Sequence, residues 1–380
     1  MKFDPYKHKE RYTIWKEKVK DGIPFVGKEN SDLILQYVND MERGLNVAAK
    51  SSKGARSFIR LNTLREKMCF FGVKFKELYK IENLTRVTED QLVGFFADMK
   101  SGIIKTKSNL VYRSVDTYSK VFKAFWHWWM KVNRKRDVEI KDITLDLDTK
   151  QEKPDWVYLT EQEVKLMAQA AKYEYRVLIM FLFDTGIRAP TELMNVKVSD
   201  FYNDCKELQI RQETSKTFGR RIKLMLCSGL IKDYIQVKKL ESPDFLFTIN
   251  PGAVNQYLKR ISEKLFGNKV SPAGQKYSDL TMYDFRHCAC CYWLPRYKSE
   301  SALKYRFGWK KSDKIHYYSE LLGMSDTISE EDLFIDSSKT EVEKSLEITK
   351  NENQLLNEKL MNMEVQMARI MEMAKQLEIS

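Results

Sequence analysis

Three segments in the second half of the chain carry side chains that could act together on a phosphodiester. Arg188 follows a glycine at the end of an apolar run in DTGIRAPTELMNVKVSD, and Arg286 begins an apolar run in LTMYDFRHCACCYWL. In RFGWKKSDKIHYYSEL, Tyr318 lies nine residues after Trp309. Each arginine alone is weak support, because arginines near helix ends usually face solvent or form structural ion pairs. Their joint order and spacing indicate a single site.

The residue types suit an attack on phosphorus. Such an attack places extra negative charge on the nonbridging oxygens, and planar guanidinium groups bind these oxygens better than ammonium groups do. We therefore expect Arg188 and Arg286 to clamp the phosphate, with the indole N–H of Trp309 as a further donor. The phenol of Tyr318 is the expected nucleophile, which would form a covalent phosphotyrosyl bond. Its neighbour Tyr317 would project about 100° away on a helix.

The elements that must position these residues are mostly helical. Thr160 and Glu163 form a predicted capping box, and the apolar run YRVLIMFLFDTG predicts a helix that ends at Gly186. The alternating runs ELQIRQ and RRIKLML predict an antiparallel hairpin with Lys216 at its turn. FLFTI predicts a further strand, and AVNQYLKRISEKLFG predicts another helix. The catalytic domain, residues 151–335, is thus predicted to be mainly α with a small antiparallel β-sheet (α+β).

The first half of the chain predicts a helical-bundle domain, residues 31–150, after an N-terminal arm or extra helix over residues 1–30. Apolar residues at helical spacing, a stop at Gly44 and a capping box from Thr88 to Gln91 indicate four helices. The segment DITLDLDTKQEKPDW, which lacks a helical period, is the predicted linker. We interpret the aromatic residues as core rather than as platforms for stacked bases. The candidates for contact with DNA phosphates are Lys53, Arg56, Arg60, Lys131, Arg134 and Lys135.

Residues 336–380 have a different pattern. From position 342 to position 377, mostly apolar residues recur at alternating steps of four and three, a period of about 3.5 that predicts a left-handed coiled coil. The alternative is a single amphipathic helix packed on its own protein. We favour self-association through a C-terminal coiled coil, in which the polar Asn353 on the seam would help to fix the register.

The composition favours a polyanionic partner. Lys and Arg total 65 against 53 Asp and Glu, a formal net charge of +12, and such an excess favours nucleic acid through counterion release. No apolar stretch of about 18 residues predicts a membrane span, and the charged N-terminus does not predict a secretory signal, so we expect a cytoplasmic protein. The cysteines lack the paired spacing of a zinc site, and we interpret Cys288, Cys290 and Cys291 as core residues of one helix. Neither a metal nor another cofactor is expected.

In the order and spacing of these segments the chain resembles the tyrosine recombinases, the phage-integrase and Xer-like enzymes, and their archaeal members in particular. The family's first box is matched by Thr185, Gly186, Arg188, Glu192, Leu193 and Asp200. The second box is matched by Tyr283, Asp284, Phe285, Arg286 and His287, and the third by Gly308, Trp309 and Tyr318. The family's hairpin lysine falls on Lys216. Any one of these segments alone would be weak, whereas together and in order they are specific.

The sequence departs from the family pattern at two positions. Glu192 lies one residue further from Arg188 than usual, which weakens the expectation that Glu192 supports Arg188. Tyr283 replaces the usual histidine of the second box, and a phenol, with an intrinsic pKa of about 10, is a poor proton acceptor near neutral pH. His287 and His316 are the alternatives for that proton transfer. We interpret His287 as a supporting neighbour and His316 as structural.

The resemblance implies a site-specific recombinase, or integrase, that cleaves double-stranded DNA and rejoins it through a 3′-phosphotyrosyl bond on Tyr318. Lys216 would protonate the departing 5′ oxygen as general acid. Because the covalent bond stores the energy of the broken linkage, neither ATP nor a metal is required. The family also implies a clamp on DNA and a homotetramer, nucleoid-associated in the host cell, that integrates or excises a mobile or viral element. A type IB topoisomerase and a catalytically silent DNA-binding protein are the alternatives.

Overall fold

The computed structural model describes residues 3–45, 54–150, 155–297, 299–321 and Thr349. The chain divides into two compact units, Met1–Ser312 and Asp313–Ser380. Apart from Thr349, the predicted coiled coil over residues 342–377 lies outside the described residues, and so does Lys53. The boundaries of the four predicted segments and self-association through the tail stay predictions.

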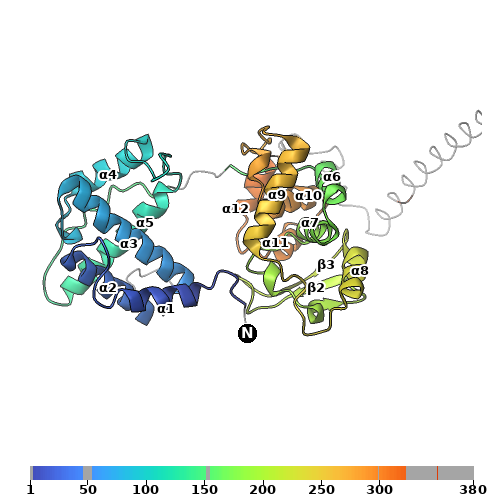
Figure 1. Cartoon of the computed structure of the whole chain (residues 1–380), viewed down its shortest axis with the longest axis horizontal. Coiled ribbons are helices and arrows are strands. Elements are labelled where there is room, and N and C mark those ends of the chain that lie inside the picture. Colours follow the sequence, from blue (N-terminus) through green and yellow to red (C-terminus); the bar gives the residue numbers. More distant parts are fainter. Residues whose placement is uncertain (1–2, 46–53, 151–154, 298, 322–348, 350–380) are drawn as a thin grey trace, which may run out of the picture. The chain divides into compact units, whose positions relative to one another are not determined.

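Helices dominate the described part of the chain (Figure 1). The α-helices and strands are, in order, α1 (His8–Lys18), α2 (Lys28–Arg43), α3 (Phe58–Tyr79), α4 (Glu89–Ser101), α5 (Val115–Arg134), α6 (Glu161–Ala170), α7 (Tyr173–Thr185), β1 (Phe201–Tyr202), β2 (Glu207–Ile210), β3 (Arg220–Lys223), α8 (Ser228–Lys238), α9 (Pro251–Phe266), α10 (Asp284–Trp293), α11 (Glu300–Phe307) and α12 (Asp313–Leu321). Short 3-10 helices are η1 (Leu84–Arg86), η2 (Leu193–Asn195), η3 (Val198–Asp200), η4 (Tyr277–Asp279) and η5 (Leu294–Arg296).

Aromatic side chains build the core of the first half. Helix α3 packs against α1, α2 and α5. Phe71 and Phe75 on α3, and Phe125 and Trp128 on α5, are almost fully buried. The indole N–H of Trp128 donates to Asp40 Oδ2 at 2.9 Å, which satisfies the one polar atom of this large side chain. Our interpretation of these aromatic residues as core is confirmed.

Local sequence signals set several helix ends where they were predicted. Thr88 and Gln91 form the reciprocal capping box at the start of α4, and Thr160 and Glu163 form the one at the start of α6. Gly44 ends α2 in the left-handed conformation, with a φ of 87°, and a Cβ there would lie 2.7 Å from a backbone carbon. Glycine is required at this stop because no other residue fits both the conformation and the space.

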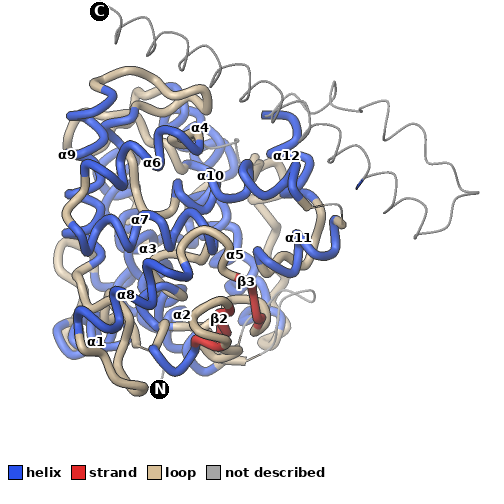
Figure 2. Tube along the Cα trace, turned by 90° about the vertical axis from the view of Figure 1, so that its right-hand side faces the viewer, coloured by secondary structure: helices blue, strands red, loops and turns tan. Residues whose placement is uncertain are grey.

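The sheet of the second half is small, as expected. Its strands are antiparallel in the order β1-β2-β3, and Leu208 on β2 lies opposite Ile222 on β3. Both side chains are buried. Figure 2 shows the short strands β2 and β3 among the helices and loops of the described residues. The predicted hairpin with Lys216 in its loop is confirmed, and so is the mainly α fold class with a small antiparallel sheet.

The strand predicted for FLFTI is wrong. Phe245 forms only an isolated bridge with Lys197, flanked by a hydrogen bond of 2.8 Å from the N–H of Leu246 to Val196 O. The ladder does not extend along FLFTI, because the antiparallel partners of its later residues lie before Val196, where the chain forms η2 (Leu193–Asn195). Leu246 and Phe247 are nevertheless buried. The apolar residues of this segment therefore indicated that it lies in the core, but not that it forms a strand.

Helices α7 and α10 pack against each other and form the buried framework beneath the second half's functional residues. Cys288, Cys290 and Cys291 on α10 are free thiols in the interior, which confirms their interpretation as core residues. The thiol of Cys288 donates to Val157 O at 3.5 Å and so ties the start of this half to α10. In the part of the chain that is described, no helix is long and apolar enough to cross a membrane.

Candidate active site

Arg188 follows the C-terminus of α7, where Gly186 turns the chain with a φ of 56°. A Cβ on Gly186 would lie 2.3 Å from the ring of Phe307, so the third segment approaches this turn too closely for any other residue. The guanidinium of Arg188 donates from Nη1 to Glu192 Oε1 and from Nη2 to Gly308 O, each at 2.7 Å. Its side chain is 15% exposed and therefore remains accessible from solvent.

Glu192 is the anionic centre of the site despite the extra residue before it. The backbone N–H of Glu192 donates to Arg188 O at 2.8 Å, which closes a local turn and returns the carboxylate to the arginine. Arg220 on β3 pairs with the same carboxylate, with 2.8 Å between Nη2 and Oε2. Burial would raise the pKa of Glu192, but the two arginines outweigh it and lower the pKa to about 2. The expectation that the longer spacing weakens support for Arg188 is corrected.

Arg286 lies in the first turn of α10 and is buried. It donates from Nη1 to Gly186 O at 2.5 Å and from Nη2 to Phe307 O at 2.6 Å. Burial, with repulsion from Arg188 and Arg220, lowers the pKa of Arg286 to about 10, so it stays charged at neutral pH. Arg188 of the first segment and Arg286 of the second thus bind consecutive carbonyl groups, those of Gly308 and Phe307, in the third segment.

Trp309 completes the packing around these guanidinium groups. Its ring stacks on Phe307 with 4.9 Å between centroids, and the guanidinium carbon of Arg286 lies 6.0 Å from the Trp309 ring centroid. The half-buried indole covers one side of the arginine while the other is held by carbonyl oxygens. Gly308 between them has a φ of 61°, and a Cβ there would lie 2.9 Å from Nη1 of Arg220.

The net positive charge around the site favours an anionic ligand. Arg188, Arg220 and Arg286 meet around the single carboxylate of Glu192, an excess of positive charge in a region that is largely withdrawn from water. A guanidinium has five N–H groups, and the hydrogen bonds of Arg188 to Glu192 and Gly308 occupy one on each terminal nitrogen. The remaining N–H groups of this fork can bind the nonbridging oxygens of a phosphate.

Lys216 lies at the exposed tip of the β2–β3 loop. Within the described residues its ammonium group has no hydrogen bond or ion pair, which leaves it available to a substrate atom. Both neighbours are anchored: Ser215 Oγ donates to Glu192 Oε1 at 3.0 Å, and Thr217 Oγ1 donates to Gly308 O at 2.8 Å. The loop is therefore tied to the arginine cluster although Lys216 itself projects outward.

Tyr283 is half-exposed at the N-cap position of α10, three residues before Arg286. Its ring meets that of His287 edge-on, with centroids 5.3 Å apart, and the other face of His287 stacks on Trp156 at 4.7 Å. His287 is thus packed between two aromatic rings as a neighbour of Tyr283, in line with its predicted supporting position.

Tyr318 lies on α12 in the second compact unit, with its side chain 3% exposed. The centroid of the Tyr317 ring lies 5.1 Å from that of Tyr318, and the two rings meet edge-on at an interplanar angle of 72°. His316 is exposed. The role of Tyr318 as nucleophile stays a prediction that the geometry of α12 alone does not test.

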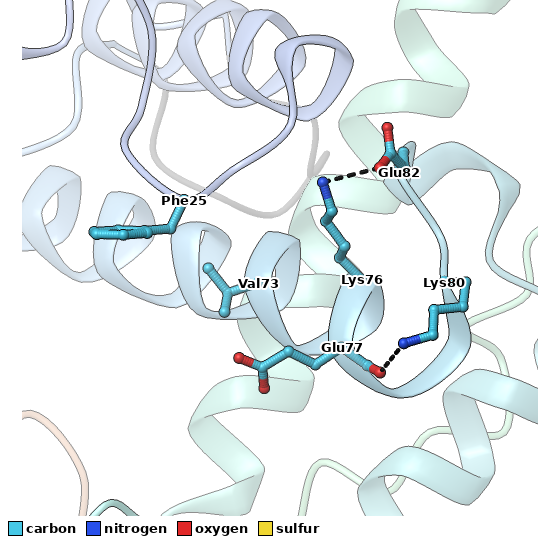
Figure 3. Close-up of a pocket in the computed structure, with 6 residues that line it drawn as sticks. All are labelled: Phe25, Val73, Lys76, Glu77, Lys80 and Glu82. Carbon is cyan, nitrogen blue, oxygen red and sulfur yellow. Dashed lines mark hydrogen bonds and ion pairs between the residues drawn. The ribbon is translucent and has the colours of Figure 1, made fainter.

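Among the predicted DNA contacts, Arg134 and Lys135 at the end of α5 are exposed, whereas Arg56, Arg60 and Lys131 are half-buried. A separate depression of about 400 Å³ lies between Phe25 and α3 (Figure 3). Its charged side chains are already engaged: Lys76 pairs with Glu82 at 2.9 Å, and Lys80 donates to a backbone carbonyl. The depression therefore adds no site for a charged ligand.

Two buried arginines were missed from the sequence. Arg220 and Ile222 both face inward on β3. The alternation of side chains in RRIK could have predicted this, because residues two apart on a strand lie on the same face. Arg306 on α11 pairs with Asp184 at the end of α7, with 2.8 Å between Nη2 and Oδ1, and both are buried. In the described residues no cluster of three His, Cys, Asp or Glu side chains could hold a metal ion.

Residues 157–325 match the model of the phage integrase family. Among solved structures, the chain is similar to the Tn1549 transposon integrase in complex with transposon right-end DNA, at 13% identity and a TM-score of 0.55, over 76% of this chain and 93% of that one. It is also similar to the XerH recombinase bound to its difH substrate, at 14% identity and a TM-score of 0.51, over 87% of this chain and 100% of that one. A lambda integrase dimer bound to a COC′ core site matches at 14% identity and a TM-score of 0.51, over 84% of this chain and 83% of that one. No curated protein sequence matches the chain.

Residues 157–325 are thus similar to the phage integrase family, and the chain has a fold similar to that of solved site-specific recombinases.

Proposed function

We propose that this protein is a site-specific recombinase that cleaves and rejoins double-stranded DNA through a 3′-phosphotyrosyl bond on Tyr318, and that it integrates or excises a mobile or viral element. One observation carries the assignment of the residues. Arg188 donates to Gly308 O and Arg286 donates to Phe307 O, so two guanidinium groups are held by consecutive carbonyls of the segment that leads into α12.

The arginines bind the scissile phosphate in this mechanism. Arg188 and Arg286 direct their remaining N–H groups at the nonbridging oxygens, and Trp309 adds its indole N–H. Because Glu192 and the carbonyl oxygens already fix both forks, little reorganisation is needed when charge builds up on those oxygens. The arrangement favours the transition state over the ground state, which is the requirement for catalysis.

Tyr318 and Lys216 carry out the cleavage of the DNA strand. The phenol of Tyr318 releases its proton to water and its oxygen attacks the phosphorus. The bond from phosphorus to the 5′ oxygen breaks, and Lys216 transfers a proton to that oxygen as general acid. Tyr283 hydrogen-bonds a nonbridging oxygen in place of the usual histidine, with His287 behind it. Attack by the 5′ hydroxyl of a second DNA end reverses these steps and releases Tyr318.

DNA is the partner that the site and the charge support. Exposed Arg134 and Lys135, together with Lys53, Arg56, Arg60 and Lys131, contact phosphates without selecting a sequence. Exchange between two duplexes uses four subunits, so the working assembly is a homotetramer on DNA, and it acts where the host DNA lies, in the nucleoid.

A nicked duplex tests the proposal directly. The probe carries the junction sequence at one end of the element that bears the gene, with a nick just downstream so that the cleaved fragment diffuses away. The full chain is expected to accumulate a covalent protein–DNA adduct, and Tyr318→Phe is expected to lose it. Tyr317→Phe, which removes the adjacent phenol, is the matched control and should retain it.

Two results would contradict the proposal. Absence of an adduct with the intact chain on the junction duplex would favour a silent DNA-binding protein. An adduct that survives Tyr318→Phe would place the nucleophile elsewhere. A two-duplex strand-exchange assay then separates a recombinase, which yields exchanged products, from a topoisomerase, which yields only relaxed circles.

A further inference from the structure

The residues on either side of Lys216 are hydrogen-bonded to two fixed acceptors. Ser215 Oγ donates to the carboxylate of Glu192 at 3.0 Å, and Thr217 Oγ1 donates to the carbonyl oxygen of Gly308 at 2.8 Å. The N–H of Thr217 also donates to Ser215 Oγ at 3.3 Å, which draws the two anchors together beneath the lysine. The backbone of Lys216 is thus held from both sides, whereas its side chain is exposed.

The same two acceptors also hold Arg188. Nη1 of Arg188 donates to Oε1 of Glu192, the oxygen that Ser215 uses, and Nη2 donates to the carbonyl that Thr217 uses, each at 2.7 Å. The carbonyl oxygen of Gly308 has two lone pairs for its two donors. Oε1 of Glu192 accepts from Arg188 and Ser215 and also, over a longer 3.3 Å, from Nη1 of Arg220, and all three bonds are formed at once. The guanidinium that binds the phosphate and the loop that carries the general acid are therefore held by the same two groups, the carboxylate of Glu192 and the carbonyl of Gly308.

The rest of the loop is fixed independently of these contacts. Arg211 at its base forms an ion pair with Asp200, with 3.0 Å between Nε and Oδ1. At the other end Gly219 approaches so closely that a Cβ would lie 2.9 Å from the backbone nitrogen of Gln212. The hairpin can therefore form without Ser215 or Thr217, and their hydroxyl groups act chiefly on the position of the tip.

We propose that Ser215 and Thr217 are positioning residues that set the distance from Lys216 to the phosphate held by Arg188, so that proton transfer to the leaving 5′ oxygen depends on both hydroxyl groups. This inference rests on the proposed function. A general acid contributes roughly 100- to 10,000-fold to a rate, and only while it stays within hydrogen-bond reach of the atom it protonates. Loss of both anchors lets the tip move away and lowers the rate of cleavage, but leaves the phosphate clamp intact.

A leaving group that needs no proton isolates this effect. In a 5′-bridging phosphorothiolate duplex, sulfur replaces the departing oxygen, and the thiolate leaves without protonation because a thiol is far more acidic than an alcohol. The variants are Ser215→Ala with Thr217→Val, which remove the two donors at little change in size. Lys216→Ala is the benchmark. Thr214→Val is the matched control, because Thr214 Oγ1 donates only to Arg211 O within the loop.

The expected result is a decrease on the order of 10- to 100-fold in the single-turnover cleavage rate of the oxygen duplex by the double variant, with a rate on the sulfur duplex within about 3-fold of the unsubstituted chain. Lys216→Ala should follow the same pattern more strongly, and Thr214→Val should resemble the unsubstituted chain on both duplexes.

Other outcomes overturn the inference. Full activity of the double variant on the oxygen duplex shows that the hydroxyl groups do not position Lys216, while the proposed function stands. Equal losses on both duplexes show that they serve the phosphate clamp or the fold instead. If the unsubstituted chain cleaves neither duplex, the proposed function itself fails and this inference fails with it.

Discussion

Removing the charge of Glu192 should destabilise the folded chain by an amount that the structure sets. The carboxylate is 1% exposed and is paired with Arg188 and Arg220, and its pKa falls from an ordinary 4.5 to about 2. Each unit corresponds to about 1.4 kcal/mol, so the ionised form stabilises the folded state by about 3 kcal/mol at neutral pH. Glu192→Gln should therefore lower the free energy of unfolding at pH 7 by about 3 kcal/mol.

The dependence on pH has a defined sign. A carboxyl group with a lowered folded-state pKa contributes its stabilisation above the unfolded pKa, near 4.5, and loses it as the pH falls toward 2. The gap between Glu192→Gln and the unsubstituted chain should thus shrink to about 1.4 kcal/mol at pH 3.

Urea unfolding of the full chain, followed by circular dichroism at pH 7 and pH 3, measures both quantities. Glu213→Gln is the control, because Glu213 is 54% exposed and its pair with Arg211 is a surface ion pair, worth less than about 1 kcal/mol. If Glu192→Gln were no less stable than Glu213→Gln, or if its deficit were the same at both pH values, the carboxylate would not be the anionic centre described above.

Three further predictions concern the turn before the first arginine, the atypical tyrosine and the DNA contacts. Gly186→Ala should lower stability by about 1–3 kcal/mol, because its Cβ would collide with Phe307 at a positive φ, and an unchanged thermal midpoint would refute this. Tyr283→His should raise the single-turnover cleavage rate at pH 7 by roughly 10-fold or more and introduce a dependence on pH near 6.5, so a flat profile at the original rate would show that no proton moves there. Replacing Arg134 and Lys135 by Ala should weaken DNA binding and reduce the slope of log K against log salt by roughly 1.8, measured by fluorescence anisotropy. An identical slope would mean that neither side chain contacts phosphate.

Features that depend on neighbouring residues were predictable from the sequence. The capping boxes at Thr88 and Thr160 and the glycine stop at Gly44 act within one helical turn, so the pattern of residues contains the whole cause. The β2–β3 hairpin was predictable for the same reason, because alternation fixes both its strands and the place of Lys216 between them.

Features that depend on distant residues were not predictable from spacing. The FLFTI segment alternates like a strand, but the coil of its partner ends the ladder after one bridge. Arg220 lies 28 residues from Glu192, and its ion pair forms only because β3 turns that side chain inward. The extra residue after Arg188 suggested a lost contact, yet a local turn restores it.

The position of the covalent bond tests the central claim most directly. The adduct formed on the nicked duplex can be digested with nuclease and protease, and tandem mass spectrometry then locates the phosphate that remains on the chain. The account predicts a single phosphorylated residue, Tyr318, in the peptide that also contains Tyr317. Phosphate on Tyr317, on Tyr283 or on any other side chain would contradict it.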